Sequence, residues 1–196
     1  MTIILASKSA ARRAVLAGAG VPHEAAVAGV DEDAVKARLL AVNATPRAIA
    51  EALAELKALK VSAAGPGLVI GSDQTLDLDG ALYDKVADVA AARERLKLLR
   101  GKPHQLHSAV VVAKDGQVIW REVVSATLVM RDFSDAFLED YLAVEGEAAL
   151  GSVGCYRLEG PGAQLFEAIE GDYFAILGLP LMGLLDLFRQ HGELPA

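Results

Sequence analysis

Residues 68–85, LVIGSDQTLDLDGALYDK, constrain the fold of this chain more than any other segment. The apolar run 68–70 suits a strand in the interior of a sheet. Gly71 lets the backbone turn, so the sequence predicts that Asp73 lies at the carboxyl end of this strand. In open α/β sheets this edge binds ligands, and a carboxylate there can hold a hard cation or take a proton from water. Lys85 follows as an opposite charge.

Two further acids in this segment favour a turn. Asp77 and Asp79 precede Gly80, and aspartate and glycine are typical turn residues. For Asp73 a turn and a functional carboxylate both remain open. An EF-hand is excluded, because with Gly80 as the sixth loop residue a valine would occupy the twelfth ligand position.

The N-terminal segment carries a second charged cluster. Residues 2–5, TIIL, indicate a strand, and residues 8–13, KSAARR, open a helix with Ser9 as its N-cap. Unpaired N–H groups at a helix start, joined by a guanidinium, form an anion site that suits phosphates. Arg12 is the predicted phosphate ligand, and a solvated basic helix face is the alternative. The sequence contains no Walker loop and no GxGxxG motif.

Three consecutive acids, residues 31–33, follow the apolar run 25–28. Such acids repel one another unless a cation or a basic wall compensates their charge, so Glu32 is a candidate ligand for a metal or for water. A helix N-terminus with acids in its first turn is the alternative. In the next predicted helix, AEALAELKALKV, spacing gives Lys57 no preference over Lys60, and lysines on such helices are mostly solvated.

Together these segments resemble the Maf family of nucleoside triphosphate pyrophosphatases, the septum-formation-inhibitor proteins. The matching segments keep the family's order and spacing over nearly the whole chain: LASKSAARRAVL (5–16), VDE (30–32), the helix with Lys57, GSDQ (71–74), Gly80 to Lys85, RGKPH (100–104), GDY (171–173) and GLP (178–180). Each segment alone is a weak signal, whereas all of them in register are specific.

The resemblance implies an α/β, Maf-like fold, related to the anticodon-binding and ITPase-like folds. An elongated mixed sheet with flanking helices is expected to form two lobes around a cleft, within a single domain of residues 1–196. The implied reaction is hydrolysis between the α- and β-phosphates, which gives a nucleoside monophosphate and pyrophosphate. Modified or otherwise non-standard nucleotides are the expected substrates.

The resemblance also implies roles for particular residues. The implied catalytic residues are Asp73, Glu32, Lys57 and Lys85, and the implied substrate-binding residues are Ser9 and Arg12. A divalent cation, Mg²⁺ or Mn²⁺, is expected on Glu32 and Asp73, because hard carboxylate oxygens suit these ions.

Three positions depart from the family's pattern. Ala10 and Val86 replace prolines, and Asp84 stands where glycine is usual. A proline at the first helical position presets the helix start, so Ala10 should cost little, whereas Lys85 is expected to be less rigidly positioned.

Three other positions separate two subgroups of the family by base. Gln74 and Glu159 match the subgroup that acts on methylated GTP, but Ala11 replaces its aromatic residue and removes a stacking surface. The sequence therefore leaves the preferred base open, with the methylated-GTP subgroup as the nearer of the two.

Composition agrees with a nucleotide enzyme and disfavours other classes. The chain has 196 residues, of which 53% are hydrophobic, so it can bury a sizeable core. Its net charge of −7 disfavours a nucleic-acid groove. Cys155 is the only cysteine and is predicted to be a small core residue, and His104 and His107 lack partners at zinc spacing, which favours structural roles.

Periodicity completes the expected order of elements. The early strands and helices are followed by a β-hairpin around residues 114–116, KDG, by amphipathic helices within 85–101 and after Ser134, and by a last helix between Pro180 and Gly192. The N-terminus is apolar before it is basic, the reverse of a signal peptide, so a cytoplasmic protein without membrane contact is expected. A homodimer is the alternative to a monomer.

Two other classes of function remain open. A non-catalytic nucleotide-binding regulator linked to cell division would use the same cleft, but binding alone needs no base such as Asp73. A sugar-phosphate hydrolase on another α/β scaffold would explain the acids but not the GLP ending.

Overall fold

The computed structural model describes residues 2–195, which form a mixed α/β fold around one sheet. The strand order is β2-β1-β3-β5-β6-β7, and β4 pairs with β3. The strands are β1 (Ile3–Leu5), β2 (Glu24–Ala25), β3 (Leu68–Leu78), β4 (Ala81–Tyr83), β5 (Pro103–Lys114), β6 (Gln117–Met130) and β7 (Phe166–Glu170). β1 is parallel to β2 and β3, and the other pairings are antiparallel, so the predicted mixed sheet is confirmed.

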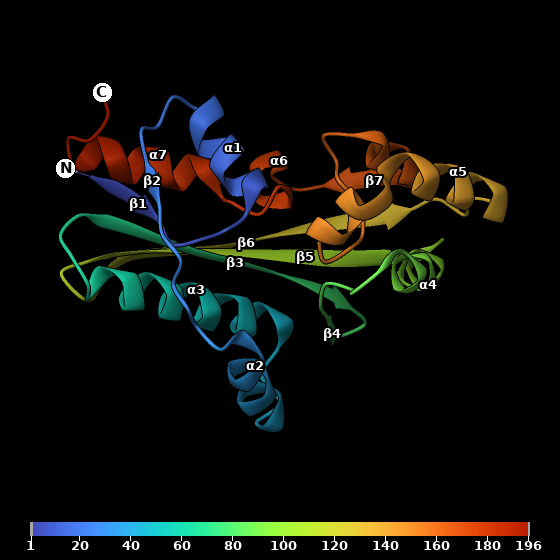
Figure 1. Ribbon diagram of the computed structural model, residues 1–196, viewed down its shortest axis with the longest axis horizontal. Helices are drawn as coiled ribbons and strands as arrows, with labels where there is room; N and C mark the ends of the chain where they lie inside the picture. Colours follow the sequence, from blue (N-terminus) through green and yellow to red (C-terminus); the bar gives the residue numbers. More distant parts are fainter. Residues whose placement is uncertain (1, 196) are drawn as a thin grey trace.

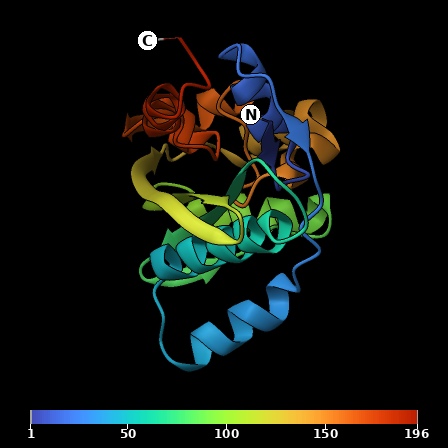
Figure 2. The same ribbon diagram turned by 90° about the vertical axis from the view of Figure 1, so that its left-hand side faces the viewer.

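Helices cover both faces of this sheet. They are α1 (Ala10–Gly18), α2 (Glu32–Ala41), α3 (Pro46–Ser62), α4 (Val89–Leu99), α5 (Asp135–Glu145), α6 (Tyr173–Ile176) and α7 (Leu181–Gln190), with 3₁₀ segments η1 (Gly146–Gly151) and η2 (Pro161–Leu165). α1 and α7 lie on one side of the sheet and α3 on the other (Figure 1). α2 lies beyond α3, away from the sheet (Figure 2). Among the described residues, no helix is long and apolar enough to span a bilayer.

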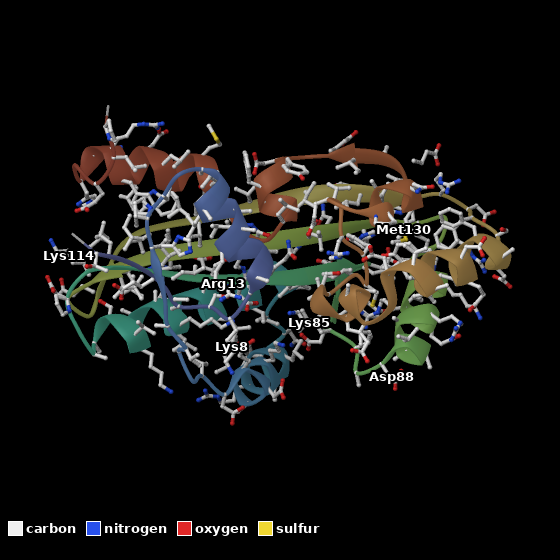
Figure 3. The ribbon with its side chains drawn as sticks, turned by 45° about the horizontal axis from the view of Figure 1, so that its top comes forward. Lys8, Arg13, Lys85, Asp88, Lys114 and Met130 are labelled. Carbon is white, nitrogen blue, oxygen red and sulfur yellow. The ribbon has the colours of Figure 1, made fainter. Side chains whose placement is uncertain are left out.

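The two larger apolar cores share the long strands and define two lobes, and two smaller apolar clusters lie around α3. In the first lobe, β1, α1 and α7 pack on β3 and β5, with Leu5, Leu16 and Phe188 fully buried. In the second lobe, α4, α5 and the segments after α5 pack on the other ends of β3, β5 and β6. Figure 3 shows Lys114, the last residue of β5, and Met130, the last residue of β6, toward opposite ends of the molecule. Because the same strands run through both lobes, one sheet fixes their relative position.

The turns follow from local chemistry, as the sequence predicts. Asp115 and Gly116 connect β5 to β6 with φ of 51° and 76°, the left-handed backbone of a tight hairpin. Asp79 and Gly80 do the same between β3 and β4, and the carboxylate of Asp77 accepts a hydrogen bond from the Gly80 N–H at 2.7 Å. The turn interpretation of Asp77 and Asp79 is thereby confirmed.

The prediction that the strand ends just before Asp73 is wrong. β3 continues to Leu78, so Asp73 lies in its middle, paired with Ala109 of β5. It is β1 that stops, at Leu5 opposite Ile70. Asp73 therefore lies just beyond the carboxyl end of β1, the parallel neighbour of β3. On this side, β1 does not continue alongside Asp73.

Gly71 serves helix packing and not a turn. A Cβ at this position would lie 2.1 Å from the carbonyl oxygen of Ala54 and 2.5 Å from the amide nitrogen of Ala58, both on α3. Such overlap with backbone cannot be relieved by a rotamer change. The glycine therefore lets α3 pack directly on β3, which brings the residues of α3 close to Asp73.

Candidate active site

A cleft of about 980 Å³ lies between the two lobes. Its walls come from the start of α1, the segment that leads into α2, the middle of β3, the segment after β4, and the loops 148–159 and 176–178. The nine site residues predicted from the sequence all line it: Ser9, Ala11, Arg12, Glu32, Lys57, Asp73, Gln74, Lys85 and Glu159. The structure thus brings the whole predicted set together, while the role of each residue stays a prediction.

Lys57 connects the two acids of the cleft. Its ammonium lies 2.6 Å from Asp73 Oδ1 and 2.8 Å from Glu32 Oε1. Lys57 and Asp73 are each only 7% exposed, whereas Glu32 keeps contact with solvent. The choice between the two lysines of α3 is also decided, because Lys60 is exposed and donates to the carbonyl of Gly29.

The two acids differ in their electrostatic environment. Burial raises the pKa of Asp73 above its ordinary value, although Lys57 and Arg12 oppose this shift. Partial burial also acts on Glu32, but Lys57, Lys36 and Arg12 outweigh it and lower the pKa of Glu32. One carboxylate with a raised pKa beside one with a lowered pKa is an arrangement suited to a general base next to a permanently charged ligand.

The start of α1 forms one wall of the cleft. The Ser9 hydroxyl caps the helix by accepting from the Arg12 N–H at 3.4 Å, as predicted. Ala10 and Ala11 are the first helical residues, so their N–H groups have no partner within the helix, and both residues line the cleft. Figure 3 shows Lys8 just before this helix, near the middle of the molecule.

Arg12 joins the start of the chain to its end. Its Nε donates to the Gly178 carbonyl at 2.8 Å, and its Nη1 donates to the Ser72 carbonyl at 2.9 Å and to the Ser7 hydroxyl at 3.3 Å. Burial lowers the pKa of Arg12, and the charges of Asp73 and Glu32 oppose that shift. Much of this guanidinium is therefore used as a structural clamp, and Nη2 is the nitrogen left for a phosphate.

Gly178 of the GLP segment makes this clamp feasible. Its φ is +95°, which favours glycine, and a Cβ there would lie 3.3 Å from Arg12 Nε. The GLP segment and the first motif, far apart in the sequence, are thus in direct contact.

Lys85 lies on the other wall and is exposed. Desolvation by the cleft and repulsion from Arg12 lower its pKa. The segment before it is anchored although the usual glycine and proline are missing, because Arg95 donates to the Asp84 carbonyl at 2.9 Å. This hydrogen bond holds the backbone at Asp84, whereas the expected looser positioning of Lys85 stays a prediction.

Lys36 is a cleft residue that sequence reasoning missed. Its ammonium pairs with the Asp84 carboxylate at 2.5 Å, and its side chain is only 14% exposed. Desolvation lowers the pKa of Lys36, but the hydrogen bond and charge of Asp84 outweigh this and raise it. The available signal was its position four residues after Glu32 on α2, which places both on one helix face.

The side chain of Gln74 is held in one orientation. Its Nε2 donates to Ser108 Oγ at 2.8 Å and to the carbonyls of Ala175 and Ile176 at 3.1 and 3.0 Å. Ser108 is buried and itself donates to the Ala175 carbonyl at 2.6 Å. Because two carbonyls can only accept, Oε1 is the atom that Gln74 has left for a ligand.

Glu159 lines the cleft and is exposed. The reason is that it belongs to the loop between η1 and η2 and not to the sheet. Its exposure leaves the carboxylate solvated, which weakens any discrimination that depends on an unpaired buried charge.

The donor set can accommodate a hard divalent ion only together with a substrate. Glu32 and Asp73 are the two carboxylates that converge, and within residues 2–195 no cluster of three or more acidic, histidine or cysteine ligands is present. Mg²⁺ typically uses one or two carboxylates and takes its other ligands from phosphates and water. The residues thus fit an ion delivered with a triphosphate better than a permanently bound one.

The remaining reactive side chains are structural. Cys155 is fully buried in the second core, and burial raises its pKa to about 11, so the prediction of a core residue is confirmed. His104 is buried, contacts the Tyr156 hydroxyl at 2.7 Å, and has its pKa lowered to about 4 by burial. His107 contacts Ser125 and Asp77, which is the predicted polar-network role.

Comparison with known proteins agrees with this geometry. The family described as Maf-like protein matches residues 2–191. The chain belongs to this family. It is 62% identical to a nucleoside triphosphate pyrophosphatase of Caulobacter vibrioides, over 98% of this chain and 96% of the relative. It is 54% identical to a protein of the same name from Granulibacter bethesdensis, over 99% of both chains, and 50% identical to a 7-methyl-GTP pyrophosphatase of Brucella abortus, over 96% of both.

We predict that Lys57→Met destabilises the fold in a pH-dependent way. Without the ammonium that both carboxylates contact, the folded-state pKa of Asp73 rises further above its unfolded value of about 4. A carboxyl group with a raised folded-state pKa stabilises the folded protein at low pH. This contribution to the free energy of unfolding is lost as the pH rises through the folded-state pKa of Asp73. Urea unfolding should therefore show a larger loss at pH 8, about 3–5 kcal/mol, than at pH 5.

Lys60→Met is the matched control for this variant, because Lys60 lies on the same helix but is exposed. It should cost about 0.5 kcal/mol or less at either pH. An equal loss at pH 5 and pH 8 for Lys57→Met would contradict the proposed coupling to Asp73.

Proposed function

We propose that this chain is a nucleoside triphosphate pyrophosphatase that hydrolyses the bond between the α- and β-phosphates. The products are a nucleoside monophosphate and pyrophosphate. The observation that carries the proposal is the buried carboxylate of Asp73, paired with Lys57 in a cleft that also contains the start of α1. The names of the relatives support the same activity.

Asp73 acts as the general base. It accepts a proton from a water molecule, the water oxygen forms a bond to the α-phosphorus, and the bond to the leaving pyrophosphate breaks. The raised pKa of Asp73 suits proton transfer, and Lys57 keeps the carboxylate oriented and ionised at neutral pH. The proton then passes to solvent.

The cationic groups of the cleft hold the phosphates. The N–H groups at the start of α1 and the Nη2 of Arg12 bind the phosphate tail, and Ser9 fixes this helix start. Lys85 approaches from the other wall and balances the charge of the leaving pyrophosphate. Its exposure lets the side chain adjust to the substrate.

Glu32 and Asp73 would hold one divalent cation, Mg²⁺ or Mn²⁺, together with the substrate. When bound, this ion supplies Lewis-acid neutralisation of the phosphate charge. Lys57 carries one positive charge, and Glu32 and Asp73 carry two negative charges. This group of three therefore has a net negative charge that would attract the cation.

The base site recognises hydrogen-bond donors on the substrate base. Gln74 has Oε1 available and Glu159 carries a carboxylate, so both side chains can accept from adjacent N–H groups of a guanine. Relatives at 50% identity that are named 7-methyl-GTP pyrophosphatase support a modified guanine nucleotide. A cytoplasmic location, a homodimer, the lack of nucleic-acid binding and a link to cell division stay predictions.

We predict that Asp73→Asn lowers kcat by about 10²-fold or more, because the amide keeps the shape but loses the charge and the basic oxygen. Pyrophosphate release measures the rate, and circular dichroism checks the fold. The exposed turn residue Asp79 provides the control, since Asp79→Asn should leave kcat unchanged. Burial raises the pKa of Asp73, so the wild-type kcat/KM should fall on the acid side at a pH above about 4. Near wild-type kcat in folded Asp73→Asn would remove Asp73 from the mechanism.

Metal removal gives a separate prediction. Activity should vanish in excess EDTA and return with Mg²⁺ or Mn²⁺, because the two carboxylates and a triphosphate otherwise repel each other. Glu32→Gln should raise the Mg²⁺ concentration needed for half-maximal activity, while Asp33→Asn, its neighbour on α2, should not. Undiminished hydrolysis in EDTA would exclude the metal site.

Base preference is tested by pyrophosphate release from a panel of GTP, 7-methyl-GTP, dTTP and UTP. We predict a higher kcat/KM for the guanine nucleotides, with Glu159→Gln reducing this preference, because guanine can donate from two adjacent N–H groups to Gln74 and Glu159, whereas thymine and uracil have a single ring N–H donor. Selection for the cationic methylated base should be modest, since Ala11 offers no stacking surface. Equal or better use of dTTP by the wild type would refute this assignment.

A further inference from the structure

A second cavity of about 360 Å³ lies beside the cleft, on the α1 side of the sheet. One helix face forms much of its wall, because Ala11, Ala14, Val15 and Gly18 follow helical spacing on α1. The other side comes from Phe174 of α6, from Leu177 and from Leu181 at the start of α7, and these elements lie beside α1 (Figure 1). The lining of this side pocket is almost entirely apolar, and Glu159 is its one charged residue.

The side pocket is continuous with the base end of the substrate cleft. Four residues line both: Ala11, Ala14, Glu159 and Leu177. Two of these, Ala11 and Glu159, are the positions that the sequence analysis relates to base choice. The group that occupies the proposed base site therefore adjoins an apolar space.

The chemistry of the pocket defines its occupant. Its size falls in the range of about 300–1,000 Å³ that is typical of small-molecule sites, and it is far larger than one methyl group needs. Phe174 contributes an aromatic ring, which favours contact with another apolar or aromatic group. Glu159 at the boundary can balance the positive charge that a guanine gains when its N7 is alkylated.

We infer that the side pocket receives an apolar substituent of the substrate base, so that this chain accepts guanine-type triphosphates alkylated with groups larger than methyl. The inference rests on the proposed function, because it concerns the same substrate in the same cleft. It differs from recognition of the base edge by Gln74 and Glu159, since most of the pocket is lined by apolar residues that do not line the cleft, such as Val15, Gly18 and Phe174.

The test compares N7-benzyl-GTP with N7-methyl-GTP as substrates. The wild type should use both with kcat/KM values within about tenfold of each other. Gly18→Leu should fill the pocket, because Gly18 lines it but not the cleft, and a Cβ there meets no atom within 4 Å. This variant should lower kcat/KM for N7-benzyl-GTP by about tenfold or more, mainly through KM, and leave N7-methyl-GTP within about twofold.

Ala17→Leu is the matched control, because Ala17 is exposed on the same helix and lines neither cavity. Ala17→Leu should leave kcat/KM unchanged for both substrates. Hydrolysis of N7-methyl-GTP without use of N7-benzyl-GTP, or an equal effect of Gly18→Leu on both, would overturn the inference and leave the proposed function intact. Hydrolysis of neither would refute the proposed function. In that case, binding of N7-benzyl-GMP, measured as a thermal shift, still tests the inference. The inference requires that this ligand raises the melting temperature of the wild type but not that of Gly18→Leu.

Discussion

The contact of Lys57 with two carboxylates is the interaction on which the rest of the site depends. It unites α2, α3 and β3 at one nitrogen atom, through Glu32 at 2.8 Å and Asp73 at 2.6 Å. A buried carboxylate without such a partner would be protonated and could not accept a proton. The contact itself depends on Gly71, because any side chain there would push α3 away from β3. The close packing of α3 on β3 at Gly71 therefore brings Lys57 to Asp73, and Lys57 keeps this carboxylate ionised.

A second constraint joins the ends of the chain. Arg12 of α1 holds the carbonyl of Gly178, 166 positions later, and that of Ser72 on β3. The start of α1, the strand with Asp73 and the GLP segment are thus fixed relative to one another. Since Gln74 also donates to the carbonyls of Ala175 and Ile176, the proposed base site and the proposed phosphate site depend on the same C-terminal segment.

Local sequence chemistry accounts for much of the fold. The N-caps Ser9 and Ser134, the hairpin at residues 114–116 and the turn before β4 follow the sequence, because each depends on residues within four positions of one another. β3 is longer than predicted, because Gly71 was interpreted as a break when its role is close packing against α3. Strand β7 was also missed, since its pattern is exposed and only pairing with β6 makes it a strand.

The sequence by itself determined the family resemblance, the helix caps, the turns and nine site residues that all line the cleft. Helical spacing treats Lys57 and Lys60 alike, and tertiary structure decided that Lys57 is the one that faces the sheet and meets Asp73. It also decided the pairing of Lys36 with Asp84 and the apolar pocket beside Ala11. The physical reason is the same in each case: charge pairing, burial and cavities arise between elements distant in sequence, and no local pattern encodes their separation in space.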